Sequence, residues 1–523
     1  MDLVAVLCRW LRFLSILKIL FIMANNNKNV LIANRGEIAI RIARTCKKLG
    51  LHPYGIYSDS DKDSLHIKYC EQSLNIGGSL PQESYLVTDK VIDAAFKLGC
   101  DFIHPGYGFH SENPKFVKLC NNKNLVFIGP PYDAMTISGD KVRARKVASK
   151  VAPVVDGVEV FNEGDAVKEA ERIGYPVMLK AVEGGGGRGL RIVNSYEDLD
   201  KAYLSSKSET MVGFGSDRVY IEKYIENPRH IEVQIIADET DIIHLGEREC
   251  SIQRRHQKLI EETPSPALST EKRNEITQTA VEIMKEIGYK SAGTVEFLFK
   301  ENRFYFMEVN ARIQVEHPIT ELVTGVDIVE QQLQVALGRR LTVNQQNINP
   351  RGHAIECRIN AEHPLSFLPS PGVVKNISIP TGNGIRVDTS LYSGYSIPIV
   401  FDSLIAKLIC WGNNRYEAIQ KMKDSLLSFR ISGIPSTIPF HISALNDTRF
   451  TDGCYDTSFV NKLKSFSVRD GDVAAAVFSL LPKRIEFLKS KVEELQDPWM
   501  SSRFDWIDVF DIHHNPNWLV TGQ

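Results

Sequence analysis

The feature that most constrains the fold is a strict alternation of polar and apolar residues near position 310. Polar side chains occupy every second position of the run, at Glu308, Asn310, Arg312, Gln314 and Glu316. Successive side chains of a β-strand point to opposite faces, so a period of two is typical of a strand. The run predicts a strand with one polar face that can do chemistry and one apolar face that packs into a core.

The residues before this run predict its partner strand. Residues 293–299 form a second strand rich in apolar residues, and Glu301 and Asn302 supply a turn between the two. Such a hairpin places Glu296 opposite Glu308. Neighbouring carboxylates repel each other, and Mg²⁺ held by carboxylates and substrate phosphates would relieve that repulsion. A solvated strand face with chance ion pairs is the alternative interpretation.

A glycine-rich segment suits phosphate binding. Residues 184–189 read Gly-Gly-Gly-Gly-Arg-Gly and lie between strands predicted at 176–182 and 190–193. Glycines let backbone N–H groups approach an anion closely. The segment lacks the Gly-Lys-Ser/Thr that opens a helix in a Walker A loop, so we expect a mobile flap over phosphates. A floppy hairpin loop is the alternative.

Basic residues gather at residues 253–258, which read Gln-Arg-Arg-His-Gln-Lys, and Lys141 follows Gly139-Asp140. A site that handles ATP needs several cations to offset the phosphate charge. A solvated basic surface is the alternative, and it is favoured for Lys141 taken alone.

Hydrophobic periodicity divides the rest of the chain into a parallel and an antiparallel part. Residues 29–137 alternate strands and helices, which is typical of an open parallel sheet. The strands are predicted at 29–34, 53–58, 101–103 and 125–129, and the helices at 37–49, 84–98 and 114–121. Beyond Lys141, strands are predicted at 218–225, 230–238 and 241–247, and helices at 271–287 and about 327–338. His230, Glu232 and Gln234 alternate with apolar residues, which predicts a sheet with one solvent-facing side.

Composition excludes several partners. The 523 residues carry a net charge of −2, with 43% hydrophobic and 24% charged residues, so neither nucleic acid nor a membrane is expected as a partner. The nine cysteines form no C-x-x-C pair, which argues against a zinc cage and favours buried thiols in a reducing, cytoplasmic compartment.

The first 22 residues are mostly apolar, with Arg9, Arg12 and Lys18 interspersed. A signal anchor, a targeting peptide and a start codon placed too early are three interpretations. The charges disfavour a membrane span, and no A-x-A-like cleavage site follows. Met23 opens a polar stretch, so an over-extended start with Met23 as the alternative start is favoured.

The motifs together closely resemble those of biotin carboxylases, members of the ATP-grasp superfamily, from about residue 29 to 465. The matching runs are residues 32–39, 104–109, the glycine-rich segment, 222–230, 253–258, 311–318 and 356–362. The last three read Gln-Arg-Arg-His-Gln-Lys, Ala-Arg-Ile-Gln-Val-Glu-His-Pro and Glu-Cys-Arg-Ile-Asn-Ala-Glu.

The resemblance implies a fold of the α/β and α+β classes. It implies a Rossmann-like parallel-sheet domain at 29–137, an ATP-grasp domain at 138–345 with a mobile lid at about 152–224, and a mixed α/β C-terminal domain at 350–465. Residues 1–28 are expected to be an extension. Residues 466–523, with an apolar helix at about 472–495, resemble an inter-domain linker.

The resemblance also implies a role for each matching residue. Implied ATP contacts are Lys141, Lys180, Gly186, Gly187, Glu222, Lys223, Tyr224, Ile225, His230, Gln253, His256, Glu296 and Glu308. Implied ligands of Mg²⁺ or Mn²⁺ are Glu296, Glu308 and Asn310. Implied bicarbonate contacts are Lys258, Arg312, Gln314, Val315 and Arg358. Glu316 is the implied base, Lys258, Arg312 and Arg358 complete the implied catalytic set, and Tyr107 with Arg358 would receive biotin. Glu183 departs from the family, where a glycine is common.

The implied activity is ATP- and bicarbonate-dependent carboxylation of biotin on a carrier protein. This is the first half-reaction of an acyl-CoA carboxylase acting on acetyl-CoA or on propionyl- or methylcrotonyl-CoA. No Ala-Met-Lys-Met hairpin is found, so the biotin carboxyl carrier protein and the carboxyltransferase subunits are expected on separate chains, with this chain a homodimer.

Three other functions stay open at this point. Another ATP-grasp ligase would use a different acceptor. A nicotinamide-dependent oxidoreductase is suggested by the N-terminal βαβ unit, which however lacks G-x-G-x-x-G after its first strand. A non-catalytic regulatory subunit is disfavoured, because every expected catalytic position holds the fitting residue type.

Overall fold

The computed structural model describes residues 28–182, 190–214 and 218–463. The first 22 residues, Glu183, Gly186, Gly187 and the helix predicted at 472–495 lie outside these residues. Within the described residues, no helix combines the length and the apolar character that a membrane span requires.

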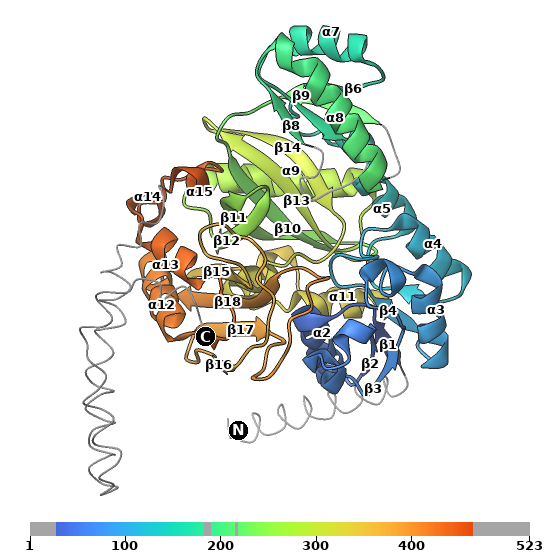
Figure 1. Ribbon diagram of the computed structural model, residues 1–523. Helices are drawn as coiled ribbons and strands as arrows, with labels where there is room; N and C mark the ends of the chain where they lie inside the picture. The colour runs from blue at the N-terminus through green and yellow to red at the C-terminus, as the bar shows by residue number, and fades with distance from the viewer. Residues whose placement is uncertain (1–27, 183–189, 215–217, 464–523) are drawn as a thin grey trace, which may run out of the picture. The chain divides into compact units, whose positions relative to one another are not determined.

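The N-terminal segment forms the predicted open parallel sheet, with strand order β3-β2-β1-β4-β5 (Figure 1). Its strands are β1 (Asn29–Ile32), β2 (His52–Tyr57), β3 (Gln72–Asn75), β4 (Phe102–His104) and β5 (Val126–Phe127). Its helices are α2 (Gly36–Lys48), α3 (Thr88–Lys97), α4 (Pro114–Asn122) and α5 (Tyr132–Gly139). The sequence patterns did not predict β3, because this edge strand is half exposed and its polar and apolar residues do not alternate.

An antiparallel sheet of eight strands forms the centre, in the order β14-β13-β10-β11-β12-β15-β18-β17. The strands are β10 (Arg229–Ala237), β11 (Ile242–Arg254), β12 (Gln257–Thr263), β13 (Ser291–Lys300), β14 (Arg303–Asn310), β15 (His353–Asn360), β17 (Ile385–Thr389) and β18 (Leu404–Gly412). Because β12 pairs with β15, one sheet contains strands from the predicted ATP-grasp segment (residues 138–345) and from the predicted C-terminal segment (residues 350–465).

The lid segment is a small antiparallel sheet, β6-β9-β7-β8, flanked by two helices (green in Figure 1). Its elements are β6 (Gly157–Val160), α7 (Glu163–Ile173), β7 (Val177–Ala181), β8 (Arg191–Val193), α8 (Tyr196–Phe214) and β9 (Val219–Lys223). Val177, Leu179, Leu199 and Ile221 belong to a core of its own. A segment with a separate core can move as a body relative to the larger sheet.

The remaining elements cover the sheets or connect them. The helices are α6 (Lys141–Ala148), α9 (Thr270–Ile287), α10 (His317–Thr324), α11 (Ile328–Ala336), α12 (Arg415–Ser428), α13 (Ile438–Asn446), α14 (Thr448–Thr451) and α15 (Phe459–Lys462). Strands β16 (Asn376–Ser378) and β19 (Arg430–Ser432) pair with each other. Single 3-10 turns lie at Asp59–Asp61, Leu65–Tyr69, Pro81–Glu83 and Gln345–Asn347.

The predicted hairpin is confirmed, but the alternating run is a strand only in its first part. Glu301 and Asn302 turn with φ of 50° and 60°, and Glu296 pairs with Glu308. Strand β14 then ends at Asn310, so the prediction of a strand over residues 311–316 is wrong. These residues form a loop that leads into α10, in which Pro318 occupies the first turn, where proline is favoured.

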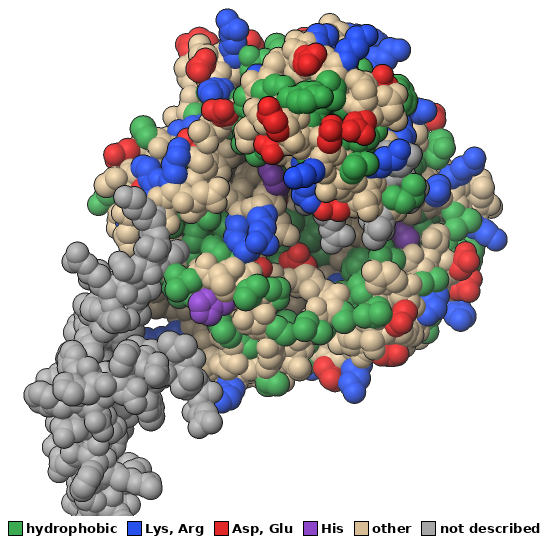
Figure 2. Space-filling view, turned by 45° about the horizontal axis from the view of Figure 1, so that its top comes forward, with side chains coloured by type: hydrophobic (Ala, Val, Ile, Leu, Met, Phe, Trp, Pro, Cys, Tyr) green, Lys and Arg blue, Asp and Glu red, His purple; other side chains and the backbone are tan. Residues whose placement is uncertain are grey.

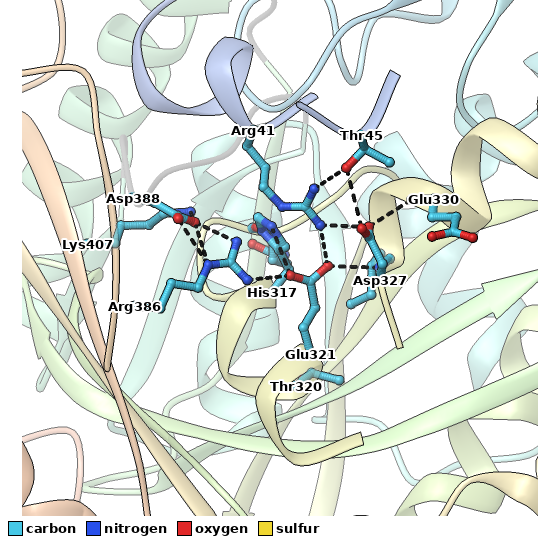
Figure 3. A network of polar contacts seen from close by, with 12 residues as sticks. Arg41, Thr45, His317, Thr320, Glu321, Asp327, Glu330, Arg386, Asp388 and Lys407 are labelled. Atoms are coloured by element: carbon cyan, nitrogen blue, oxygen red, sulfur yellow. Dashed lines mark hydrogen bonds and ion pairs between the residues drawn. The ribbon is translucent and has the colours of Figure 1, made fainter. Parts of the chain in front are cut away.

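A network of charged side chains joins α2 of the N-terminal segment to α10 and to β17 of the central sheet (Figure 3). Arg41 on α2 donates to Glu321 on α10 and to Asp327 before α11, each at 2.7 Å. Arg386 on β17 donates to the other oxygen of Glu321 at 2.7 Å and to Asp388 at 2.6 Å. Because each charge meets opposite charges from other elements, the network fixes how α2, α10 and β17 pack.

We expect Arg41→Met to lower the free energy of unfolding by about 3–5 kcal/mol, because it leaves the buried Glu321 and the partly buried Asp327 without this cation. Arg44→Met is the matched control one turn later on α2, since Arg44 is exposed and lies over the Tyr69 ring at 5.1 Å. Urea denaturation of both variants measures the difference. Equal losses in the two variants would contradict a dominant role for the buried network.

Candidate functional site

The ammonium group of Lys258 lies at the centre of the site. It contacts Glu232 at 2.5 Å, Glu316 at 2.7 Å and Glu296 at 2.8 Å. The three carboxylates come from β10, the loop before α10 and β13, and all three residues are buried. One cation therefore ties together three segments that are far apart in the sequence.

The charges around Lys258 set its ionisation and that of its partners. Burial alone would lower the pKa of Lys258, but Glu232, Glu296 and Glu316 outweigh it and raise that pKa well above its usual value. Burial alone would raise the pKa of Glu316, but Lys258 and Arg358 hold it well below its usual value. Glu316 is therefore an ionised carboxylate between two cations.

The polar side of β10 is buried, so the prediction of a solvent-facing side at His230, Glu232 and Gln234 is wrong. Arg248 on β11 covers it and is itself fully buried. Its guanidinium donates to Glu232 at 2.5 Å and to Gln234 at 2.7 Å. Alternation alone does not distinguish a wet face from a polar face that lines an interior site, because both show a period of two.

The loop after β14 carries the next side chains of the site. Arg312 donates to Gln314 and to Asn310, each at 3.1 Å, and to Glu112 at 2.9 Å. Glu112 also accepts from the backbone N–H of Ala311 at 3.1 Å. The sequence motifs did not reveal Glu112, although it follows the matched run at 104–109 by three residues.

Arg358 on β15 lies on the other side of Glu316. It donates to Glu316 at 2.9 Å and to Glu261 on β12 at 2.6 Å. Tyr107 donates its hydroxyl to Glu37 on α2, and its ring is half-buried. The backbone carbonyl of Val315 accepts from the fully buried Lys407 at 3.0 Å, which anchors the loop that carries Glu316.

The lid brings together some of the residues predicted to contact ATP. Lys180 on β7 pairs with Glu222 on β9 at 2.5 Å. Burial lowers the pKa of Lys141, which lies within the electrostatic reach of Glu308 and Lys180. The amine of Lys223 is instead held by the carbonyls of Gly174 and Tyr175 at 2.8 and 3.0 Å, away from Glu222. Tyr224 and Ile225 follow β9 and are half-buried.

The side chains of His230 and Gln253 lie 2.6 Å apart on the neighbouring strands β10 and β11. His230 also approaches Glu296 at 3.1 Å. His256 is exposed in the tight turn between β11 and β12, where Arg255 and His256 have φ of 50° and 64°. The space-filling view shows a hollow in this face of the molecule, with basic, acidic and histidine side chains around it (Figure 2).

The oxygen atoms of Glu296, Glu308 and Asn310 suit a hard divalent cation. Glu296 and Glu308 are directly opposite each other on β13 and β14, and Asn310 adds an amide. Burial, followed by repulsion from Glu296, raises the pKa of Glu308. Two carboxylates and an amide match the oxygen ligands that Mg²⁺ prefers, and Lys258 at 2.8 Å from Glu296 offsets only part of the repulsion between the two carboxylates. Two other clusters of possible metal ligands lie within the described residues, His230 with Glu232 and Glu296, and Glu232 with Cys250 and Glu316. Lys258 contacts the carboxylates of both clusters.

Three family models together cover most of the chain. The model for the biotin carboxylase N-terminal domain matches residues 26–135, and that for the biotin carboxylase C-terminal domain matches residues 356–462. The model for the carbamoyl-phosphate synthase L chain ATP-binding domain matches residues 140–344 between them.

Curated relatives match over the same region. Biotin carboxylase 1 of Bacillus subtilis is 48% identical over 440 residues, which are 83% of this chain and 98% of the relative. A pyruvate carboxylase subunit of Methanothermobacter thermautotrophicus is also 48% identical over 440 residues, which are 83% of this chain and 90% of the relative.

Solved structures agree with this fold. A biotin carboxylase in complex with a nucleotide described as β-γ-ATP, from Campylobacter jejuni, has a TM-score of 0.82 and 47% identity, covering 83% of this chain and 98% of that one. A dimer of the biotin carboxylase domain of 2-oxoglutarate carboxylase from Hydrogenobacter thermophilus, in complex with MgADP, ADP and bicarbonate, has a TM-score of 0.81 and 44% identity, covering 83% and 97%. The predicted fold class, with its parallel-sheet and ATP-grasp parts, is confirmed.

Removal of the central cation should show in the pH dependence of stability. In Lys258→Met three carboxylates lose their cation, so their folded-state pKa values rise and their ionisation opposes folding as pH increases. We expect the free energy of unfolding to fall by about 3–5 kcal/mol near neutral pH. This loss should shrink as pH falls to about 5, because protonation of the buried carboxyl groups relieves the variant while Lys258 keeps Glu296 and Glu316 of the wild type ionised. Lys290→Met, at an exposed pair with Glu239, is the control. Urea unfolding across pH measures this, and a loss that grows on acidification would contradict it.

Proposed function

Because this chain belongs to the biotin carboxylase family, we propose that it catalyses the ATP- and bicarbonate-dependent carboxylation of biotin on a carrier protein. The observation that carries the proposal is the position of Glu316. This carboxylate lies between Lys258 and Arg358, and Lys258 links it to Glu296 at the hairpin that suits a metal-bound nucleotide.

Bicarbonate is a poor electrophile, so it needs activation before its carbon can be transferred. Its oxygen attacks the γ-phosphorus of ATP, the bond to ADP breaks, and carboxyphosphate forms. Such a phosphoryl transfer depends on positioning and on cations near the transferred group. Lys141, Lys180 and Lys258 would supply those cations. Glu296, Glu308 and Asn310 would hold Mg²⁺, which when bound offsets charge on the phosphates.

Glu316 is proposed to remove the proton of bicarbonate. Without substrate, Lys258 and Arg358 stabilise its anion, so it is a weak base. Bicarbonate bound to Lys258, Arg312, Gln314, Val315 and Arg358 would draw those two cations away from Glu316. The pKa of Glu316 then rises, which makes it a stronger base only when its substrate is present.

Carboxyphosphate decomposes in water, so the site needs to exclude solvent after ATP binds. The lid, with its separate core and the pair of Lys180 and Glu222, is suited to closing over the nucleotide. Carboxyphosphate then breaks into CO₂ and phosphate, phosphate takes the N1′ proton of biotin, and N1′ attacks the carbon of CO₂ to form carboxybiotin. Arg358 would stabilise the negative oxygen of the ureido ring, with Tyr107 beside it.

The final acceptor and the partners stay predictions. The names of the relatives include pyruvate carboxylase and 2-oxoglutarate carboxylase besides biotin carboxylase, so they do not favour the acyl-CoA that the sequence motifs led us to expect. Carrier and carboxyltransferase on separate chains, and a cytoplasmic location, are likewise kept as predictions. A homodimer is supported by the dimeric Hydrogenobacter relative.

Purified protein with ATP and Mg²⁺ should release ADP at a rate that depends on both bicarbonate and biotin. We expect Glu316→Gln to slow this release by about 10²–10⁴-fold, the usual contribution of a general base. Glu239→Gln, at a largely exposed carboxylate, is the control. A coupled ADP assay measures the rates. ADP release indifferent to bicarbonate and biotin would refute the proposed function, and an active Glu316→Gln would refute the role of the base.

Glu112→Gln should raise the KM for bicarbonate by about 2- to 5-fold and leave the KM for ATP unchanged. The reason is that a partly exposed ion pair with Arg312 stabilises its position by about 0.5–1 kcal/mol. Glu275→Gln, which breaks a partly exposed pair with Lys272 on α9, outside the matching sequence runs, serves as the control. An increase confined to the KM for ATP would contradict the proposed contact of Arg312 with bicarbonate.

A further inference from the structure

Two buried carboxyl groups lie next to Arg358. Glu261 on β12 and Glu356 on β15 are directly opposite each other in the antiparallel ladder, and both residues are fully buried. Residues in such a pair project from the same face of a sheet, with their Cβ atoms close together. The two carboxyl groups are therefore neighbours in the interior.

Their hydrogen bonds are incomplete. Glu261 accepts from Arg358 with one oxygen, at 2.6 Å. The other oxygen of Glu261 and both oxygens of Glu356 find no hydrogen-bond partner among the described residues. Buried polar atoms without a partner are rare in folded proteins, so three in one place need an explanation.

The surroundings of Glu356 are apolar. Ile409 lies opposite it on β18, and Ile319 and Val323 of α10 pack with Ile409 over that face of the sheet. The charged groups that act on the pair are Lys258, Glu316, Arg358 and Lys407. Lys407 is itself committed to the carbonyl of Val315 at 3.0 Å and to Glu37 at 3.2 Å.

Two adjacent carboxylates in such a place disfavour each other's ionisation. Burial raises the pKa of Glu261 to about 7, with Arg358 opposing the rise. Burial also raises the pKa of Glu356 well above its usual value, and Lys407 opposes this only in part. Geometry and burial thus both favour one proton on the pair.

We propose that Glu261 and Glu356 share a single proton at neutral pH, and that the pair thereby keeps Arg358 oriented and available to an anionic substrate. A hydrogen on Glu356, donated to the free oxygen of Glu261 after a small side-chain rotation, would give two of the three oxygens without a partner their hydrogen bond. The remaining negative charge on Glu261 orients the guanidinium. A second negative charge there would weaken its attraction for an anion.

The identity of that anion, bicarbonate or the ureido oxygen of biotin, rests on the proposed function. The shared proton of Glu261 and Glu356 does not depend on the proposed function. Glu261 and Glu356 are positioning residues in this proposal, because they act on the substrate only through Arg358.

Infrared difference spectroscopy on the full chain without substrates tests the shared proton directly. The spectrum of the wild type minus Glu356→Gln at neutral pH should show the loss of a protonated carboxyl band and no loss of a carboxylate band. Loss of a carboxylate band instead would overturn the proposal. Glu261→Gln is the second variant in case Glu356→Gln does not fold. It should lose a carboxylate band and keep the protonated carboxyl band of Glu356, because burial keeps Glu356 protonated when no carboxylate lies beside it. A Glu261→Gln spectrum without a protonated carboxyl band would overturn the proposal.

The pH profile of kcat/KM for bicarbonate tests the consequence. From about pH 6 to about pH 9, kcat/KM of the wild type should fall more steeply than kcat/KM of Glu356→Gln. The reason is that only the wild type can place a second negative charge beside Arg358. Glu261→Gln should be lower at every pH, since Arg358 loses the partner that orients it. Superimposable profiles of wild type and Glu356→Gln would contradict the proposal, as would a Glu261→Gln variant that behaves like the wild type.

The two hypotheses fail in different ways. A wild type that shows the protonated band but no bicarbonate-dependent ADP release would refute the proposed function alone. A wild type that is active but lacks the band would refute the shared proton alone.

Discussion

The contact of one ammonium group, that of Lys258, with three buried carboxylates is the interaction on which the site depends. Removing ions from water is costly, and a buried charge persists only where opposite charges and hydrogen bonds surround it. Glu232, Glu296 and Glu316 meet that condition only together with Lys258 and with Arg248 and Arg358 behind them. The acids and the cations therefore hold each other in place.

The rest of the fold supplies these charges from segments that the chain separates widely. Strands β10, β12, β13 and β15 belong to one sheet and carry most of them. Glu316 lies in a loop outside the sheet, and Lys407 on β18 of the sheet holds that loop by binding the carbonyl of Val315. The network of Arg41, Glu321 and Arg386 fixes α10 directly after that loop (Figure 3). The stability of the fold and the proposed catalysis would thus rely on the same buried ion pairs.

Local patterns predicted much of this arrangement. The hairpin and the pairing of Glu296 with Glu308 follow from alternation and from the turn at Glu301 and Asn302. The parts that the sequence did not predict are tertiary. Arg248 makes the polar side of β10 an interior face, and Glu112 holds Ala311 and Arg312 in a loop where alternation predicted a strand. Neither partner is near in sequence to the residue it changes, so no local pattern contains it.

The most direct test of this account follows the oxygen atoms of bicarbonate. With oxygen-18 bicarbonate, ATP and biotin in unlabelled water, attack of bicarbonate on the γ-phosphorus leaves one labelled oxygen on the released phosphate. Mass spectrometry of that phosphate should therefore show a single oxygen-18 for each biotin carboxylated. Unlabelled phosphate would mean that water, not bicarbonate, attacks ATP, and would contradict the role given to the site around Lys258 and Glu316.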